Sequence, residues 1–320
     1  MASVVVLCVA SSAAQQRVDP LPDSMEPFTE TIPGTAVSFT MIPVPGGVVD
    51  VEREVPATEE GGEPTTELVE VEVAPYYMLQ TEVTWDLYDV LVFRFDLPEE
   101  DRRNEDDPDG ITRPTHPYIA TDRGYGHNGW PAISISHNGA ESFCKWLTAK
   151  TGKRFRLPTE DEWEHAARAG SARSVGRWWF GDDQDELKER AWFRLSSNLK
   201  THAVGSLPAN PFGLHEMIGN AAEWCTTHDG QYVLRGGSFQ DRGSKANSFY
   251  RAIPNRRWNA SDPQLPKSIW WLADGPFAGF RVICEAENGA PAPAVAVETG
   301  SGSGAADDPR PERPRAPRVP

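Results

Sequence analysis

Apolar and polar residues alternate near the start of the chain in the pattern of a β-sheet. Residues 37–44 and 48–55 are rich in β-branched side chains, and residues 68–73 alternate apolar and acidic side chains. A period of two is typical of a half-buried strand, so we expect three strands here. The acidic stretch 56–66 would join the last two of these strands as a long hairpin, and residues 99–109 form a second acidic stretch. Their carboxylates lack the spacing of a calcium loop, which favours solvated, charged sheet edges over calcium-binding or partner-binding loops.

The middle of the chain contains a first well-marked helix. Asn138 and Glu141 have the spacing of a capping box, and Gly152 follows at the distance expected of a helix terminator. The apolar residues between them recur on one helical face. These are Ala140, Phe143, Cys144 and Leu147.

A second helix follows after a short strand. Residues 154–158 are β-prone and end at a proline, and Thr159 and Glu162 then repeat the capping-box spacing. We expect this helix to end at Gly170. Beyond it glycine, proline, asparagine and aromatic residues dominate without a lasting period. The pattern predicts an α+β fold with little regular secondary structure.

Composition narrows the class of protein. The chain of 320 residues has 31 Lys and Arg against 47 Asp and Glu, a formal net charge of −16, which argues against nucleic-acid binding. Its 11 tryptophans and 13 phenylalanines against 5 methionines predict a rigid aromatic core. No apolar run reaches the roughly 18 residues that a membrane span needs.

The N-terminus resembles a secretory signal. Residues 4–10 are apolar, and Ser12 and Ala14 fit a small-residue cleavage site, although no basic residue precedes the apolar run. We therefore interpret residues 1–14 as a signal peptide and expect an exported protein, periplasmic or extracellular. An apolar N-terminus without targeting function is the alternative.

The rest of the chain divides by composition. Residues 15–35 are proline-rich and aperiodic, as in a linker. Residues 36–285 form the predicted domain. Residues 286–320 are rich in Ala, Pro and Gly and contain too few large apolar residues for a core, which predicts a disordered tail.

Short motifs run in order through the predicted domain. They are Arg156–Gly170, Phe212–Leu214, Gly219–Trp224, Leu234–Phe239 and Gly279–Arg281. This series resembles the formylglycine-generating enzyme family, also called sulfatase-modifying factors. Single motifs of this kind occur by chance, but the ordered series spans residues 37–284. The resemblance implies one compact domain with a C-type-lectin-like α+β architecture.

The resemblance also implies a chemistry that this chain lacks residues for. Active members oxidise a sulfatase cysteine to formylglycine with O₂ and a Cu(I) ion held by two cysteine thiolates. Those positions fall on Asp241 and Ala246, and no cysteine occurs between Thr226 and Ile283. A carboxylate is a hard ligand poorly matched to Cu(I), and alanine offers none. The sequence thus favours a non-catalytic binding or scaffold module. The alternatives are a formylglycine-generating oxidase with other ligands, or another oxidation chemistry in the same groove.

Two further positions concern the groove in which the family binds a protein or peptide. Ala222 stands where a tryptophan is usual, which would flatten the binding surface. Ser238 matches the family's active-site serine, but a turn-forming hydroxyl beside two glycines is an equal interpretation. The related sulfoxide-synthase branch uses iron held by histidines. The seven histidines here contain no i,i+4 pair, which disfavours that reading.

A structural calcium ion is the metal that the resemblance does support. By carry-over its ligands are the carboxylates of Glu216 and Glu223 and the carbonyls of Gly219 and Ala221. Mixed carboxylate and carbonyl oxygens suit Ca²⁺. Two surface glutamates without a metal are the alternative.

The resemblance finally implies a disulfide between Cys144 and Cys284. Two buried thiols acting as small apolar side chains are the alternative. Cys225 would then be an unpaired core residue rather than a nucleophile.

Overall fold

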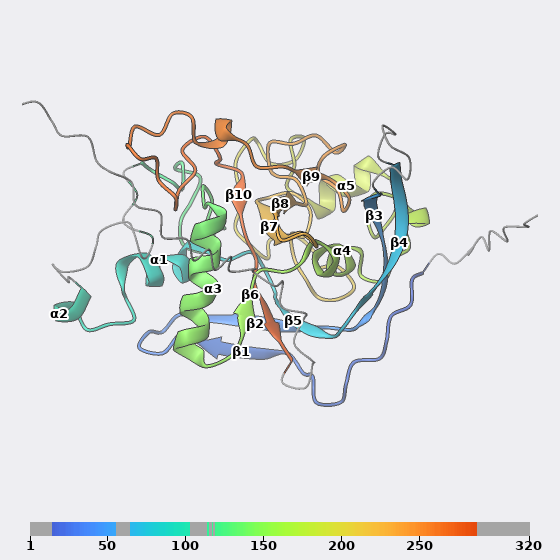
Figure 1. The fold of residues 1–320 in the computed structure, drawn as a ribbon, viewed down its shortest axis with the longest axis horizontal. Coiled ribbons are helices and arrows are strands. Elements are labelled where there is room, and N and C mark those ends of the chain that lie inside the picture. The colour runs from blue at the N-terminus through green and yellow to red at the C-terminus, as the bar shows by residue number, and fades with distance from the viewer. Residues whose placement is uncertain (1–14, 56–64, 103–113, 115–116, 118, 287–320) are drawn as a thin grey trace, which may run out of the picture. The chain divides into compact units, whose positions relative to one another are not determined.

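The computed structural model describes residues 15–55, 65–102, 114, 117 and 119–286 (Figure 1). The predicted signal peptide, most of both acidic stretches and residues 287–320 of the predicted tail lie outside the described residues. No helix in the described part is long and apolar enough to cross a bilayer.

A five-stranded antiparallel sheet joins the two ends of the domain. Its order is β1 (Phe28–Thr31), β2 (Ser38–Val44), β5 (Tyr76–Leu79), β11 (Ile283–Glu285) and β6 (Phe155–Arg156). The late strand β11 lies between β5 and β6, so the chain closes on itself. Strand β1 falls in the segment predicted as a linker, and that prediction is wrong there. The strand has only four residues in a proline-rich segment, so the sequence pattern did not indicate it; it pairs with β2.

A second sheet carries the central motifs. Its order is β10 (Ala278–Gly279), β7 (Ala222–Thr226), β8 (Tyr232–Arg235) and β9 (Arg251–Ala252), with β10 parallel to β7. Strands β7 and β8 are largely buried. Because both strands are buried and paired, β8 fixes the start of the loop that follows it at Gly236.

The expected hairpin forms a separate two-stranded ribbon. Strands β3 (Gly47–Val55) and β4 (Thr65–Val73) pair antiparallel along nine residues each. Val49 and Val51 are buried on the inner face, as the alternating pattern predicts. Figure 1 shows the ribbon beside helix α4 (Glu160–Arg168).

The two predicted helices form, with one different cap. Helix α3 (His137–Thr151) begins after Ser136, whose side chain accepts a hydrogen bond from the Gly139 amide. The predicted cap at Asn138 is therefore wrong, because a serine two residues earlier already accepts that bond. Gly152 ends α3 in the left-handed conformation, as predicted.

Helix α4 has the predicted capping box. The Thr159 side chain accepts from the Glu162 amide, and the Glu162 carboxylate accepts from the Thr159 amide. The left-handed residue that ends α4 is Ala169, one position before the predicted Gly170.

Helix α1 (Trp85–Phe93) has no counterpart in the sequence prediction. Six of its nine residues are buried, and only Asp86 and Asp89 are polar, so the polar face is narrow and the helical period in the sequence is weak. Short helices complete the described structure. They are α2 (Glu99–Arg102), α5 (Gln184–Arg190) and two 3₁₀ turns at Arg173–Val175 and Arg256–Asn259.

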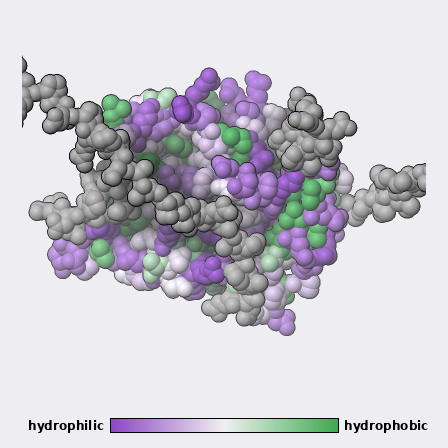
Figure 2. Space-filling view, in the orientation of Figure 1, coloured by the Kyte–Doolittle hydropathy of each residue, from purple (hydrophilic) through white to green (hydrophobic). Residues whose placement is uncertain are grey.

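The core is aromatic, as the composition predicts. Trp85, Tyr88, Phe143, Trp271 and Phe280 are almost fully buried, and Tyr88 contacts the rings of the other four. Edge-to-face and offset ring pairs of this kind add stability beyond their buried area. Figure 2 shows a mostly hydrophilic surface around this core, with hydrophobic residues gathered over part of β4.

Candidate functional site

Three of the sequence motifs meet at one buried carboxylate, that of Glu223 on β7. The Arg281 guanidinium donates to it at 2.9 Å, and the Trp163 indole N–H from α4 donates at 2.7 Å. Glu223 and Arg281 are both almost completely buried. Arg281 also donates to the carbonyls of Leu79, Gln80 and His215. A buried ion pair with its remaining donors satisfied fixes the relative positions of the strands and helix that carry it.

Two more buried glutamates lie close to this pair. The Glu216 carboxylate accepts backbone N–H groups of Gly205 and Leu207 at 2.7 and 3.0 Å. Burial raises the pKa of Glu216 against the effect of these hydrogen bonds. Burial and then the negative charge of Glu216 raise the pKa of Glu82 well above its usual range.

The predicted calcium ligands are thus only partly free to bind a cation. Among the described residues, no group of three or more His, Cys, Asp or Glu side chains is arranged to hold a metal ion. The predicted set needs just two carboxylates with the Gly219 and Ala221 carbonyls. Both Glu216 oxygens already accept N–H donors, and Glu223 is held by a cation of the protein itself. The calcium site therefore stays a prediction.

The segment after β8 is a tight loop that returns toward itself. Gly236 and Gly237 have φ values of +84° and +69°, in the left-handed region that favours glycine. A Cβ on Gly237 would lie 2.6 Å from the Lys245 carbonyl oxygen, so the loop closes only with glycine there. The loop therefore brings Gly237 directly against the backbone of Lys245 and Ala246.

Within this loop Ser238 and Asp241 bind each other. Ser238 is fully buried, and its amide and hydroxyl both donate to Oδ2 of Asp241, at 3.0 and 2.7 Å. The Asp241 amide donates in return to the Ser238 carbonyl at 3.0 Å. The hydroxyl thus stabilises a turn, the second of the two interpretations of Ser238.

Ala246, the second position that the resemblance implies for a copper ligand, has no side-chain donor atom. Ala246 is fully buried, and its carbonyl accepts the Trp178 indole N–H at 2.7 Å. One methyl group and one carboxylate engaged in a turn do not fit Cu(I), which needs two soft sulfur ligands. No chemistry can therefore be derived through copper at this loop.

Ala222 also differs from the expectation of a flattened groove. Its side chain is buried in the core, and its amide donates to the Phe277 carbonyl where β7 meets β10. The substitution therefore contributes a small core residue rather than an open surface at this point.

The predicted disulfide does not form in the structure. Cys144, Cys225 and Cys284 are all buried thiols. Cys144 and Cys284 pack in the same hydrophobic cluster, which corresponds to the alternative of small apolar core residues. Burial raises the pKa of the Cys144 and Cys225 thiols, so neither is a reactive thiolate.

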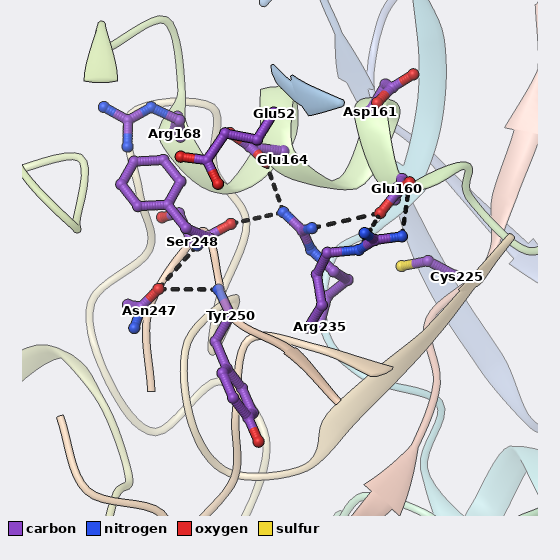
Figure 3. Close-up of polar contacts among 12 residues, drawn as sticks. Glu52, Glu160, Asp161, Glu164, Arg168, Cys225, Arg235, Asn247, Ser248 and Tyr250 are labelled. Carbon is purple, nitrogen blue, oxygen red and sulfur yellow. Dashed lines mark hydrogen bonds and ion pairs between the residues drawn. The ribbon is translucent and has the colours of Figure 1, made fainter. Parts of the chain in front are cut away.

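An ionic network around α4 was not predicted as a site (Figure 3). It lines a pocket of about 140 Å³ between α4 and the ribbon. Glu160 and Glu164 are buried within it and pair with the buried Arg235, at 3.5 and 2.6 Å. The remaining pairs are Arg53 with Glu160 and Asp161, Arg173 with Glu52 and Glu164, and Arg251 with Glu160.

The network contains as many carboxylates as guanidinium groups. Burial raises the pKa of Glu164, opposed by the positive charges of Arg235 and Arg173. Burial also lowers the pKa of the neighbouring Arg168 to about 10. No local sequence pattern indicates this network, because its partners lie up to 121 residues apart in the chain. Its balanced charges attach the ribbon to α4 rather than favour a charged ligand.

His127 fixes the loop around Tyr125, which contacts the segment after β8; we call this set of contacts the histidine clamp. His127 lies 2.7 Å from Asp89 and 3.1 Å from Asp122, and its ring stacks on Trp85. Partial burial opposes protonation, but the hydrogen bonds from the imidazole to both aspartates, together with their negative charges, outweigh it and raise the pKa of His127. Tyr125 of the same loop packs edge-on against Phe239.

Comparison with a family model accounts for most of the chain. Residues 30–286 match the model described as the sulfatase-modifying factor enzyme 1-like domain. This range includes part of β1 and ends one residue after β11.

Several curated proteins are similar in sequence. The inactive C-alpha-formylglycine-generating enzyme 2 of Bos taurus is 30% identical over 147 residues, covering 42% of this chain and 46% of that protein. The formylglycine-generating enzyme of Mycobacterium tuberculosis is 36% identical over 110 residues, covering 31% and 34%. The serine/threonine-protein kinase pkn1 of Chlamydia pneumoniae is 33% identical over 142 residues, covering 44% and 21%. The chain spans less than half the length of each.

Solved structures agree on the fold. The Treponema denticola variable protein 1 superposes with a TM-score of 0.54 at 22% identity, covering 82% of this chain and all of that one. The structure of PvdO from Pseudomonas aeruginosa gives a TM-score of 0.52 at 24% identity, covering 80% and 100%. The α+β architecture predicted from the motif series is therefore confirmed.

Proposed function

The chain belongs to the sulfatase-modifying factor family, and we propose that within it this protein is a binding or scaffold module without copper-dependent oxidation. The observation that carries the proposal is the bond between Ser238 and Asp241. The carboxylate at the place of a copper cysteine serves as the acceptor of a turn.

The rest of the loop supports the same reading. Ala246 offers no ligand atom on its side chain. Cys225 lies in the same hydrophobic cluster as Ala246, and burial raises the pKa of its thiol well above the usual value. A copper(I) centre needs thiolates that are deprotonated and accessible. The buried contacts of Glu223 and Arg281 meanwhile remain complete, so the fold is kept where the oxidation chemistry is not.

The relatives are compatible with either outcome, since their names include active and inactive formylglycine-generating enzymes. A protein or peptide ligand in the family groove would be retained by a module that had lost turnover. Family membership alone favours oxidase activity, and the loop chemistry favours its loss.

Peptide turnover tests the proposal. The full chain is incubated with Cu(I), O₂ and a peptide containing Cys-x-Pro-x-Arg, with the Mycobacterium tuberculosis enzyme as a parallel positive control. We expect no aldehyde product by mass spectrometry from this chain under conditions in which the control converts its peptide. Conversion by this chain would overturn the proposal and favour an oxidase with other ligands.

We also propose that the protein is exported. The apolar run at residues 4–10 and the small residues Ser12 and Ala14 support this. Expression with a C-terminal tag and N-terminal sequencing of the mature product should give Gln15 as the first residue. An intact N-terminus in a cell-retained product would contradict export.

A further inference from the structure

The loop at residues 193–200 turns its leucines outward and a serine inward. Leu195 and Leu199 are 64% and 51% exposed, whereas Ser197 is fully buried. The Ser197 hydroxyl donates to the Phe239 carbonyl at 2.6 Å and accepts from the Leu199 amide at 3.1 Å. Single exposed leucines are ordinary on a protein surface, but two on one short, hydrogen-bonded loop form an apolar patch that needs an explanation.

Leu199 holds its outward position in an unfavourable backbone conformation. Its φ is +57°, and that of Asn198 is +56°, both in the left-handed region. A leucine is disfavoured there, because its Cβ approaches the following carbonyl oxygen. Strained residues of this kind are concentrated at ligand-binding segments. The strain therefore supports a binding role for the exposed leucine without identifying the ligand.

Positive charge is concentrated on this loop and on the adjacent segment after β8. The Arg194 amide donates to the Asp241 carbonyl at 2.9 Å, so the two segments lie side by side. Asp241 is the only acidic residue in 193–202 and 238–250, and Ser238 already donates twice to its carboxylate. Four exposed cations of these segments form no ion pair within the described residues. They are Arg194, Lys200, Arg242 and Lys245.

Helix α5 lies beside these segments without neutralising them. Its buried Leu187 contacts the second segment at Gly243. Glu189 follows Leu187 by two positions, which is about 200° around a helix, so its carboxylate lies on the opposite side. Two other carboxylates are engaged by cations of the same helix. The pairs are Asp185 with Lys188 and Glu186 with Arg190. A chain of net charge −16 thus has a locally positive surface that also exposes two leucines.

We propose that this leucine–arginine surface, formed by residues 193–200 and 238–246, binds an acidic segment of a partner protein. The carboxylates of that segment pair with Arg194 and Arg242, whose guanidinium groups can each donate two parallel hydrogen bonds. Apolar side chains between the carboxylates pack on the two exposed leucines. An anionic membrane fits less well, because a bilayer is extended and would also meet the negative charge of the rest of the chain.

Two short peptides of matched shape test the proposal on the full chain. Acetyl-Glu-Leu-Asp-Leu-Glu-amide is acidic, and acetyl-Gln-Leu-Asn-Leu-Gln-amide replaces each carboxylate by an amide of the same size. Binding is followed by NMR shifts of the methyl groups of Leu195 and Leu199. We expect saturable shifts with the acidic peptide that weaken as salt is added, because exposed charges are screened. The amide peptide should bind about tenfold more weakly, since it lacks the charge-assisted hydrogen bonds.

Four substitutions separate this surface from other exposed leucines and cations. Leu195→Ser should weaken binding of the acidic peptide about tenfold through lost apolar contact, whereas Leu265→Ser, at a leucine 94% exposed elsewhere, should leave it unchanged. Arg242→Gln should weaken binding about threefold and reduce its salt dependence, whereas Lys145→Gln on α3 should do neither. All four side chains are exposed, so the variants should keep the fold.

The proposal is overturned by equal binding of the two peptides, by equal effects of Leu195→Ser and Leu265→Ser, or by no binding at all. Binding to phosphatidylglycerol vesicles but not to the acidic peptide would also overturn it, in favour of a membrane surface. An acidic partner presupposes the binding role proposed above, but the two claims fail separately. Aldehyde formation decides the oxidation chemistry, and the peptide titration decides what this surface binds.

Discussion

Two motif segments of this protein, close in the sequence, differ in what they have kept. The segment of Glu223, with Arg281 and Trp163, retains a complete buried set of charges and donors. The segment of Ser238 to Ala246 has a turn-forming carboxylate and a buried methyl group at the two positions where the sequence resemblance implies sulfur ligands. The difference teaches that a complete buried set of charges and a loop without the implied thiols occur together in one fold.

The largest effect is expected in the first segment. Arg281→Met leaves the buried Glu223 carboxylate without its cation, which should lower the free energy of unfolding by about 3–5 kcal/mol. Urea denaturation measures this. The double variant Arg281→Met with Glu223→Gln removes both charges and should recover much of the loss. If the double variant were as unstable as the two losses added together, the pair would not be coupled and its structural role would be wrong.

Calcium tests whether the first segment also keeps a metal. If Glu216 and Glu223 bind Ca²⁺ with the Gly219 and Ala221 carbonyls, calcium at about 100 times its Kd should add about 2.7 kcal/mol of stability. The thermal unfolding midpoint should therefore rise with calcium and not with magnesium. The rise should disappear in Glu216→Gln. An unchanged midpoint at saturating calcium would remove the metal from the account.

A smaller loss is expected in the second segment. Asp241→Ala removes the acceptor for the Ser238 amide and hydroxyl, which should cost about 1–2 kcal/mol, as for the loss of a capping side chain. Asp241→Asn retains an acceptor oxygen and should lose less. Chemical denaturation compares the two variants. Equal stability of Asp241→Ala and the unchanged chain would mean that the turn does not depend on this carboxylate.

The smallest effect concerns the loop that borders the second segment. Because the pKa of His127 is raised in the folded protein, its contribution is fully present below the unfolded value near 6.5. It is lost as the pH rises through the higher folded pKa. The side chain is 42% exposed, so solvent screening limits the contribution to no more than about 1 kcal/mol. His127→Gln should flatten stability between pH 6 and 8, measured by urea midpoints. A slope equal to that of the unchanged chain would exclude the clamp.

The sequence predicted more of the fold than of the site. The period-two pattern located β2, β3 and β4, and the Thr159 capping box located α4, because these signals are local. Helix α1 has only two polar residues, Asp86 and Asp89, and β1 is four residues long in a proline-rich segment, so both carry a weak local signal. The helix cap was predicted at Asn138 because it has the capping-box spacing, but Ser136, two residues earlier, caps α3. The disulfide was predicted from the family resemblance alone, and it does not form.

At the candidate site, the sequence predicted residue identities but not the contacts between residues. The absence of cysteines at positions 241 and 246 was readable directly. The contact between Ser238 and Asp241 depends on the closure of a loop by Gly237, and the network of Glu160, Glu164 and Arg235 depends on packing between distant segments. Such contacts follow from tertiary structure and leave no periodic trace in the sequence.

Cu(I) binding tests the central difference between the two segments most directly. A competition titration against a colorimetric Cu(I) chelator is run on the unchanged chain and on the double variant Asp241→Cys with Ala246→Cys. The account predicts no stoichiometric Cu(I) uptake by the unchanged chain and uptake of one ion by the variant, since two thiolates suit this ion. Tight binding of one Cu(I) by the unchanged chain would contradict the account.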